Sequence, residues 1–423
     1  MSSPITSISI TDVRTFSGIH HAELSRINLL IGNNSVGKST FMGCLNAIGQ
    51  MARLTDLDDH TNVFDREPFC MGSFNSIVRE GSQSFRVEIG MGQGIFRKFG
   101  IDFTGSNSNI PNIEIGLQML MREKVSKIPP NLSITREISS DHPQHWRFKG
   151  PEFQFLLDQS QVSYSQFTSW LSRSVRYGYL PFSGDPSRYM KRAGDPTPKE
   201  LAAFTKFVNF FHHYFHSSVQ STPITPIIPH MLKRKRQYSV NPIESLCDDV
   251  DLSEINRLGR KVGLFNDILV NKYSDDHFEV LVKISDSYHN LIDVGYGVIS
   301  LLPLIAALSQ DSLESLFLLQ QPEVHVHPSA QSELIKMIAQ SNHAFIIETH
   351  SDHIIAWLRI LVKEKVIEPS EVAIIFFEQL GKSNPSTCLH QITLDHRANL
   401  IGQPPNYREF FMNETSRLLG LVA

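Results

Sequence analysis

The feature that most constrains the 423-residue sequence is a glycine-bounded loop between an apolar run and a helical pattern. Residues 27–31 are apolar apart from Asn28, which is typical of a buried strand. From Ser39 to Leu54 apolar residues recur every three or four positions, as on one face of a helix. The loop between them reads Gly32-Asn33-Asn34-Ser35-Val36-Gly37-Lys38-Ser39 and fits the pattern Gly-x-x-x-x-Gly-Lys-Ser/Thr. The order strand, loop, helix predicts that this loop cradles a phosphate.

The residue types of the loop suit a phosphate for separate physical reasons. Gly32 and Gly37 allow tight turns that point backbone N–H groups inward. The N-terminus of the following helix adds positive potential. Lys38 would reach the β- and γ-phosphates of a nucleotide, and Ser39 would hold Mg²⁺ through its hydroxyl. The alternative is an ordinary glycine loop, which the flanking strand and helix disfavour.

The remaining pattern predicts an α/β fold. After residue 250, buried runs at 316–319, 344–347 and 372–377 alternate with helical patterns, so we expect a parallel sheet covered on both faces. We predict three parts: one half of an α/β domain over 1–115, a mainly helical insertion over 116–250, and the second half with a short tail over 251–423. The clearest helix of the insertion begins at Thr197-Pro198-Lys199-Glu200, which has the form of a capping box.

Composition excludes several classes of protein. With 41% hydrophobic residues the chain can bury a large core, which excludes general disorder. The net charge of −4 excludes a globally basic nucleic-acid binder, although it leaves the local run Lys233-Arg234-Lys235-Arg236 open. Four widely spaced cysteines and the lack of a secretion signal predict a cytoplasmic protein. The most apolar stretch, 298–308, is too short for a bilayer, so we expect no membrane span.

Polar residues follow two of the later buried runs. The first leads into Gln320-Gln321-Pro322-Glu323 and Val324-His325-Val326-His327-Pro328, where a nucleoside triphosphatase places metal-binding and water-orienting groups. The second leads into Glu348-Thr349-His350-Ser351. His325 and His327 share a face of an extended segment, but no third ligand has a metal-binding spacing, so helix caps or nucleotide contacts are favoured over a metal site.

With these motifs the two flanks of the chain, about residues 1–115 and 250–415, resemble bacterial AAA-type ATPases of the OLD (overcoming lysogenization defect) group. The motifs that carry the resemblance are GNNSVGKST, NLIDVGYG, QQPEVHVHP and ETHSD. The tail at 407–411 resembles short members without a nuclease domain. The resemblance implies a P-loop NTPase with an ABC/SMC-like head, which sandwiches ATP and Mg²⁺ between two protomers of a homodimer or higher even oligomer.

The resemblance also implies roles for individual residues. The loop from Gly32 to Thr40 would bind the phosphates, and His350 would be a switch histidine near the γ-phosphate. Residues 293–300, which include Asp293, Gly295 and Gly297, would form a signature segment that reaches the γ-phosphate of the partner protomer.

Three departures from the family pattern bear on hydrolysis. Gln320 stands at the metal-side carboxylate position and Gln321 at the general-base position, and neither amide can accept a proton at neutral pH. The signature serine is also shifted, because Ile299 occupies its place and Ser300 follows. The nearest carboxylate is Glu323. We therefore expect ATP binding with slow or conditional hydrolysis.

The leading functional prediction is an ATP-dependent dimeric switch whose insertion acts on a partner. Family analogy adds a separately encoded toxin or nuclease effector in anti-phage defence. An SMC-like DNA-repair ATPase that grips nucleic acid through residues 233–236 is one alternative, and a hydrolysis-deficient ATP-binding scaffold is another. A self-contained nuclease is disfavoured because too few residues follow the last predicted strand, and a compact kinase because the segment between Lys38 and Gln320 is too long.

Overall fold

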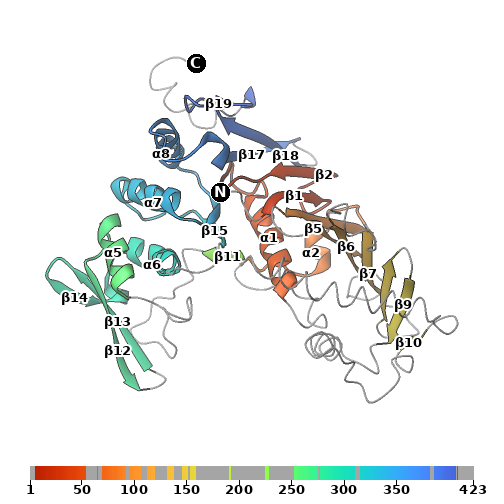
Figure 1. Ribbon diagram of the computed structural model, residues 1–423, viewed down its shortest axis with the longest axis horizontal. Coiled ribbons are helices and arrows are strands. Elements are labelled where there is room, and N and C mark those ends of the chain that lie inside the picture. The colour runs from red at the N-terminus through yellow and green to blue at the C-terminus, as the bar shows by residue number, and fades with distance from the viewer. Residues whose placement is uncertain are drawn as a thin grey trace, which may run out of the picture.

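The computed structural model describes most of the two flanks of the chain and short parts of its middle. The described residues are 5–53, 64, 69–91, 96–105, 112–119, 131–137, 145–150, 153–158, 190–191, 224–227, 252–274, 277–309, 315–381, 385–405 and 407. They form three β-sheets, with helices packed against both faces of the central one (Figure 1).

The central sheet has seven strands in the order β11-β15-β16-β3-β17-β18-β19. The first five are parallel and the last two are antiparallel to their neighbours. Their bounds are β3 (Ile27–Gly32), β11 (Ile224–Ile227), β15 (Leu316–Gln320), β16 (Ala344–Glu348), β17 (Val372–Leu380), β18 (Ser386–Leu394) and β19 (Leu400–Ile401). The predicted parallel sheet is confirmed, and β3, β15 and β16 consist mostly of apolar residues because both faces of the sheet are covered there.

Alternate residues of each buried strand pack into two separate cores. On β3, Leu30 faces one core, whereas Leu29 and Ile31 face the other. The helix α1 (Lys38–Arg53) packs in the first core, between the central sheet and the strands around β1. The second core contains the helices α5 (Leu252–Val262), α6 (Tyr296–Leu308), α7 (Pro328–Gln340) and α8 (Asp352–Lys363). The period-two alternation of strand side chains therefore divides one sheet between two hydrophobic interiors.

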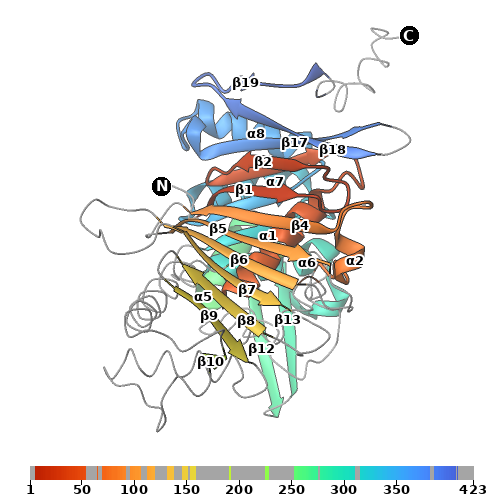
Figure 2. The same ribbon diagram turned by 90° about the vertical axis from the view of Figure 1, so that its right-hand side faces the viewer.

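A nine-stranded antiparallel sheet lies beyond α1, in the order β10-β9-β8-β7-β6-β5-β4-β1-β2 (Figure 2). Its strands are β1 (Ile5–Thr11), β2 (Ile19–Glu23), β4 (Ser84–Met91), β5 (Phe96–Thr104), β6 (Asn112–Met119), β7 (Asn131–Glu137), β8 (His145–Gly150), β9 (Phe153–Asp158) and β10 (Met190–Lys191). The short helix α2 (Phe74–Ile77) precedes β4. This sheet is continuous across residue 115, which lies inside β6, so the predicted domain boundary does not coincide with an element boundary.

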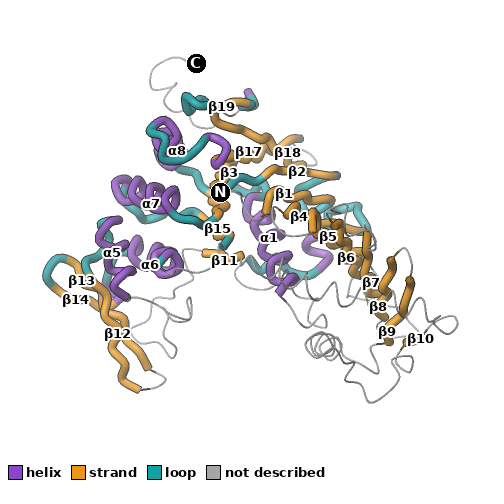
Figure 3. Tube along the Cα trace, in the orientation of Figure 1, coloured by secondary structure: helices purple, strands orange, loops and turns teal. Residues whose placement is uncertain are grey.

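The third sheet has three antiparallel strands, β12 (Asp267–Ser274), β13 (His277–Ile284) and β14 (Ser287–Asn290), beside α5 and α6 (Figure 3). A 3-10 turn over Leu291–Asp293 then leads to α6, and a second over Pro369–Glu371 leads to β17. In the described part of the chain no helix is long and apolar enough to cross a membrane.

The segment predicted to be a mainly helical insertion is described only in part. Its described residues belong to β6–β11, which are strands. The helix predicted from Thr197 and the basic run 233–236 lie outside the described residues. Helical character therefore stays a prediction for the remainder of 116–250.

Arg26 fastens the start of β3 to the layer of helices. Its buried guanidinium donates to the backbone oxygens of Ala339 and Ser341 at 3.0 Å each, at the carboxyl end of α7, and to Glu371 Oε1 at 2.7 Å. A cation suits this position because the last carbonyl groups of a helix lack intrahelical partners. Burial tends to raise the pKa of Glu371, but hydrogen bonds from the Glu368 amide and from Arg26 outweigh burial and hold the pKa below its usual 4.5.

We predict that Glu371→Gln lowers the free energy of unfolding at pH 7 by about 1–2 kcal/mol, because it weakens a charge-assisted hydrogen bond. A carboxylate whose pKa is lowered in the folded state stabilises the fold at pH values above its unfolded-state pKa. That contribution is lost as the pH falls through the folded-state pKa. The difference between wild type and variant should therefore shrink below about pH 4.5. Urea unfolding across pH measures it, with the exposed Glu364→Gln as control; a difference constant with pH would contradict this account.

Candidate functional site

The glycine-bounded loop connects the end of β3 to the start of α1, as the sequence predicted. Gly32 and Gly37 have φ angles of 152° and 102°, in the region that favours glycine, and Ser35 between them has a φ of 63°. A Cβ atom on Gly32 would lie 2.4 Å from the backbone oxygen of Phe377, and one on Gly37 would lie 2.9 Å from the Phe16 ring. Both positions therefore require glycine for conformation and for space.

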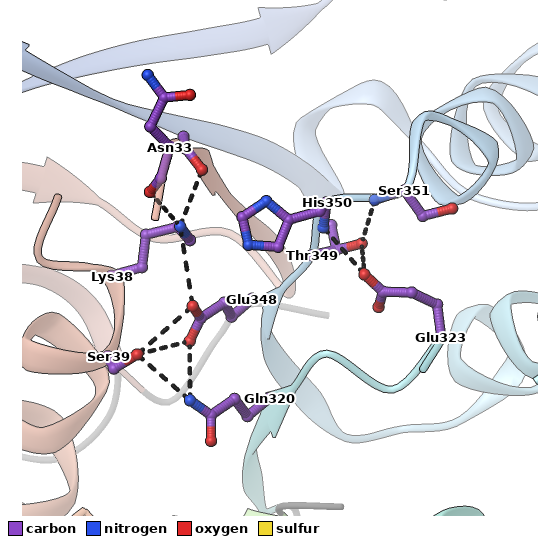
Figure 4. Close-up of polar contacts among 10 residues, drawn as sticks. Asn33, Lys38, Ser39, Gln320, Glu323, Glu348, Thr349, His350 and Ser351 are labelled. Atoms are coloured by element: carbon purple, nitrogen blue, oxygen red, sulfur yellow. Dashed lines mark hydrogen bonds and ion pairs between the residues drawn. The ribbon is translucent and has the colours of Figure 1, made fainter. Parts of the chain in front are cut away.

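Lys38 turns back into this loop. Its Nζ donates hydrogen bonds to the backbone oxygens of Gly32 at 2.9 Å and Asn33 at 2.7 Å (Figure 4). Glu348 Oε1 lies 3.9 Å from the same nitrogen. Burial lowers the pKa of Lys38, and the negative charge of Glu348 opposes this by favouring the ammonium form. The ammonium group is thus held among the loop carbonyls, beside the amides that would face a phosphate.

Glu348 is the carboxylate beside Lys38 and Ser39, and it is not among the predicted site residues. It is the last residue of β16 and only 4% exposed. Ser39 Oγ donates to Glu348 Oε2 at 3.1 Å. Gln320 Nε2 lies 3.3 Å from Ser39 Oγ and donates to Glu348 Oε2 at 3.4 Å. An acidic residue at the end of a buried strand, two positions before the predicted His350, was the available signal.

The two strand ends meet because of the register of the sheet. Gln320 of β15 and Glu348 of β16 are Cα partners in the parallel ladder. The structure therefore places the predicted Gln320 beside Ser39. Gln321 follows in a turn with a φ of 45°, and its backbone N–H donates to the backbone oxygen of Glu348 at 2.8 Å.

Glu323 and His350 belong to a second polar group, at the turn that follows β16 (Figure 4). Glu323 Oε1 accepts from Thr349 Oγ1 at 2.8 Å and from the His350 amide at 2.9 Å, so this carboxylate shapes the turn that carries the histidine. Two buried atoms, Glu323 Oε2 and His350 Nε2, have no hydrogen-bond partner in the described part of the protein. Buried polar atoms without partners are rare in native proteins and mark places where a ligand or water completes the structure.

The electrostatics of this pair follow from its surroundings. Burial, with a smaller contribution from the charge of Glu348, raises the pKa of Glu323. Burial and the nearby Lys38 cation lower the pKa of His350, which favours a neutral imidazole. A neutral imidazole can donate through one ring nitrogen and accept through the other.

The predicted signature segment lies on the opposite face of the central sheet from α1. Asp293 ends a 3-10 turn, Gly295 caps α6, and Gly297 lies in its first turn. A Cβ atom on Gly297 would lie 2.7 Å from the backbone oxygen of His325, whereas one on Gly295 would meet nothing within 4 Å. The ring of Tyr296 also lies 5.0 Å from that of His325. This segment therefore packs on the turn after β15.

Of the two histidines predicted to be helix caps or nucleotide contacts, His327 is a helix cap, whereas the ring of His325 lies beside that of Tyr296. His327 caps α7, with Nδ1 accepting from the Ser329 amide at 3.3 Å. Among the residues that the structure describes, no group of three or more His, Cys, Asp or Glu side chains could hold a metal ion by itself.

A lysine held inside a glycine-bounded loop, a serine at the start of the next helix and a carboxylate beside that serine define the class: a P-loop ATPase domain. A family model described as "AAA domain, putative AbiEii toxin, Type IV TA system" matches residues 27–356, and the chain belongs to that family. No curated protein is significantly similar to the chain.

Three solved SMC head structures are distantly similar. The SmcHead bound to the C-winged helix domain of ScpA has a TM-score of 0.47 at 9% identity, covering 92% of this chain and 98% of that one. The SMC head domain from Thermotoga maritima has a TM-score of 0.40 at 10% identity, and the match covers 91% of this chain and 97% of that one. The third is the Smc head domain with an extended coiled coil bound to the C-terminal domain of ScpA derived from Pyrococcus furiosus. It has a TM-score of 0.41 at 10% identity, and the match covers 100% of this chain and 99% of that one.

The two signature glycines should respond differently to a methyl group. We predict that Gly297→Ala lowers the free energy of unfolding by about 1–3 kcal/mol, because its Cβ would press on the backbone of His325. Gly295→Ala is the matched control, with open space at its Cβ and an expected cost of about 1 kcal/mol or less as an altered helix cap. Thermal unfolding of both variants gives the comparison; equal losses would show that the contact with His325 does not constrain position 297.

Proposed function

We propose that the chain is an ATP-binding switch in which two copies close on ATP and Mg²⁺. The observation that carries the proposal is the Lys38 ammonium, which is fixed by two backbone oxygens beside a carboxylate and the Ser39 hydroxyl. Residues 32–40 supply the amides and the helix N-terminus that a triphosphate requires. Ser39 would contact the metal ion, whose positive charge would neutralise the phosphates.

Dimerisation is proposed from the position of the signature segment. Asp293, Gly295 and Gly297 stand at the start of α6, on the opposite sheet face from α1, so a second copy would bring this helix N-terminus to the γ-phosphate. ATP would then favour the closed pair over separate copies by the contacts it makes with both.

Slow hydrolysis is proposed from the side chains that surround the loop. Attack of water on the γ-phosphate transfers a proton from the water, and the amides of Gln320 and Gln321 cannot accept it. His350, with its unpartnered Nε2, is the neutral group that could orient the water or the phosphate. Glu323 acts as a positioning residue, because it holds the His350 amide and Thr349.

The biological setting is proposed from the family. Its description names a putative AbiEii toxin of a type IV toxin–antitoxin system, and the motifs of this chain resemble the OLD group. We place the protein in the cytoplasm as a regulator of a separately encoded effector in anti-phage defence. The Gln320–Gln321 pair favours one rival, an ATP-binding scaffold without hydrolysis. An SMC-like repair ATPase that binds DNA or RNA through residues 233–236 is the other, and salt-dependent binding of nucleic acid would support it.

The proposal predicts that nucleotide controls the oligomeric state. With ATP and Mg²⁺ the mass in solution should double, and without ATP it should fall back. Lys38→Ala should lose both ATP binding, by more than tenfold, and the shift in mass, because the buried cation that faces the phosphates is removed. Equilibrium binding with light scattering measures both, and Lys336→Ala, which removes a lysine paired with Glu333 on α7, is the control. Binding by Lys38→Ala equal to wild type would contradict the proposal.

Hydrolysis should depend on Glu323 more than binding does. We predict a wild-type turnover well below 1 per second, and a further loss of about tenfold in Glu323→Gln, because the turn that presents His350 loses its carboxylate. ATP affinity should stay within about threefold, since Glu323 hydrogen-bonds the turn residues and not the loop. Single-turnover assays measure the rate, with Glu333→Gln as the matched control. Undetectable turnover in the wild type would favour the scaffold.

A further inference from the structure

The carboxylate beside the Ser39 hydroxyl comes from a different strand than the motif predicted. The predicted metal-side position is Gln320 at the end of β15, which has no charge. The carboxylate that contacts Ser39 Oγ belongs to Glu348, at the end of the neighbouring strand β16. The negative charge at this edge of the sheet therefore comes from the strand next to the one that the motif indicates.

The register of the sheet makes this displacement physically simple. Gln320 and Glu348 are directly paired in the parallel ladder, so their side chains leave the sheet at the same level. Neighbouring strands lie about 4.8 Å apart, and a glutamate side chain is long enough to cover such a distance. Glu348 Oε2 accordingly comes within 3.1 Å of Ser39 Oγ. A carboxylate at either of the two paired positions can thus reach the same hydroxyl.

The contacts of Glu348 suit a metal role better than a purely structural ion pair with Lys38. Lys38 Nζ makes its two short hydrogen bonds to backbone oxygens, and Glu348 Oε1 is more distant from it at 3.9 Å. The other carboxylate oxygen, Oε2, faces Ser39 Oγ, the hydroxyl that a phosphate-binding loop offers to Mg²⁺. Gln320 Nε2 donates to the same oxygen at 3.4 Å, as residues behind a metal ligand do when they orient it.

The donor set is also appropriate for the ion. Mg²⁺ prefers oxygen ligands and is commonly held by one or two protein groups together with substrate phosphates and water. The described residues contain no cluster that could hold a metal without a nucleotide. A site of Ser39 and Glu348 completed by phosphate oxygens and water fits both observations.

We propose that Glu348, with Ser39, supplies the protein oxygens that receive the Mg²⁺ of a bound Mg²⁺–nucleotide, directly or through a water, and that Gln320 orients Glu348. This inference rests on the proposed nucleotide binding. It assigns to β16 the charge that the motif places on β15, and it makes Gln320 a supporting residue.

The test measures how much Mg²⁺ strengthens ATP binding, by titrating ATP into the full chain in Mg²⁺ and in EDTA. In Glu348→Gln the gain in affinity from Mg²⁺ should fall by about tenfold or more, while affinity in EDTA should hold or rise, because a negative charge near the phosphates is lost. The double variant Gln320→Glu/Glu348→Gln has the same composition as wild type and returns a carboxylate to the adjacent strand end. It should recover much of the gain.

Two further measurements keep the roles distinct. Glu348→Asp retains the charge opposite Lys38 but draws the carboxylate oxygens back from Ser39. It should therefore reduce the gain in ATP affinity from Mg²⁺ by several-fold without loss of thermal stability. If Glu348→Gln does not fold, Glu348→Asp takes its place in the test. Electron paramagnetic resonance of Mn²⁺–ATP bound to each variant should show an altered metal environment in the two single Glu348 variants. Glu333→Gln, which removes a partly exposed carboxylate on α7, is the control for a lost carboxylate.

The outcomes separate this inference from the function on which it rests. If the wild type binds ATP but Glu348→Gln loses affinity equally in Mg²⁺ and EDTA, Glu348 is only a counter-ion for Lys38, and the inference is wrong while the proposed function stands. If the wild type binds no ATP under either condition, the proposed function fails and the inference falls with it.

Discussion

The buried charge of Lys38 is the interaction on which the rest of the site depends. An ammonium group removed from water is strongly destabilising unless it is hydrogen-bonded and paired. Here the backbone oxygens of Gly32 and Asn33 accept from it, and Glu348 provides the opposite charge nearby. Those partners come from two strands, so the charge is tolerated only when β3 and β16 lie side by side. The pairing of strands that stabilises the sheet is therefore also the pairing that assembles the site.

The central sheet satisfies that requirement by having a full core on each face. Side chains of β3, β15 and β16 alternate between the core around α1 and the core of α5–α8, so a slip of one residue would move each side chain into the other core and disrupt the packing of both. This locks the register that pairs Gln320 with Glu348. The site then lies at the carboxyl ends of parallel strands, where loops are free to carry polar residues because the strands below them are fixed.

Two buried polar atoms at this edge of the sheet have no hydrogen-bond partner among the described residues. Glu323 Oε2 and His350 Nε2 are buried without hydrogen bonds in the described residues, and each such atom costs about 1–3 kcal/mol. Local rules are broken in native proteins chiefly where function requires it. His350 lies close enough to Lys38 for the ammonium charge to lower its pKa, which is consistent with a site completed by a ligand.

The sequence by itself determined the parts of the protein whose physics is local. The glycine-bounded loop, α1 and the buried strands β3, β15, β16 and β17 follow from contiguous patterns of glycine and apolar residues, and the structure confirms these elements within a few residues. Short exposed strands such as β2, β14 and β19 carry no comparable pattern and were not predicted. The grouping of β6–β10 into one sheet with β1 was likewise beyond reach, because strand pairing depends on contacts between distant segments.

Only the tertiary structure decided which carboxylate stands beside Ser39. Positions 39, 320 and 348 are far apart in the chain, and the motif indicated Gln320, because a motif compares residues along one strand and not across two. Strand order and register brought Glu348 to the same point instead. A linear sequence fixes what each strand end can offer chemically, whereas the hydrogen-bonded ladder between strands fixes which of those groups meet.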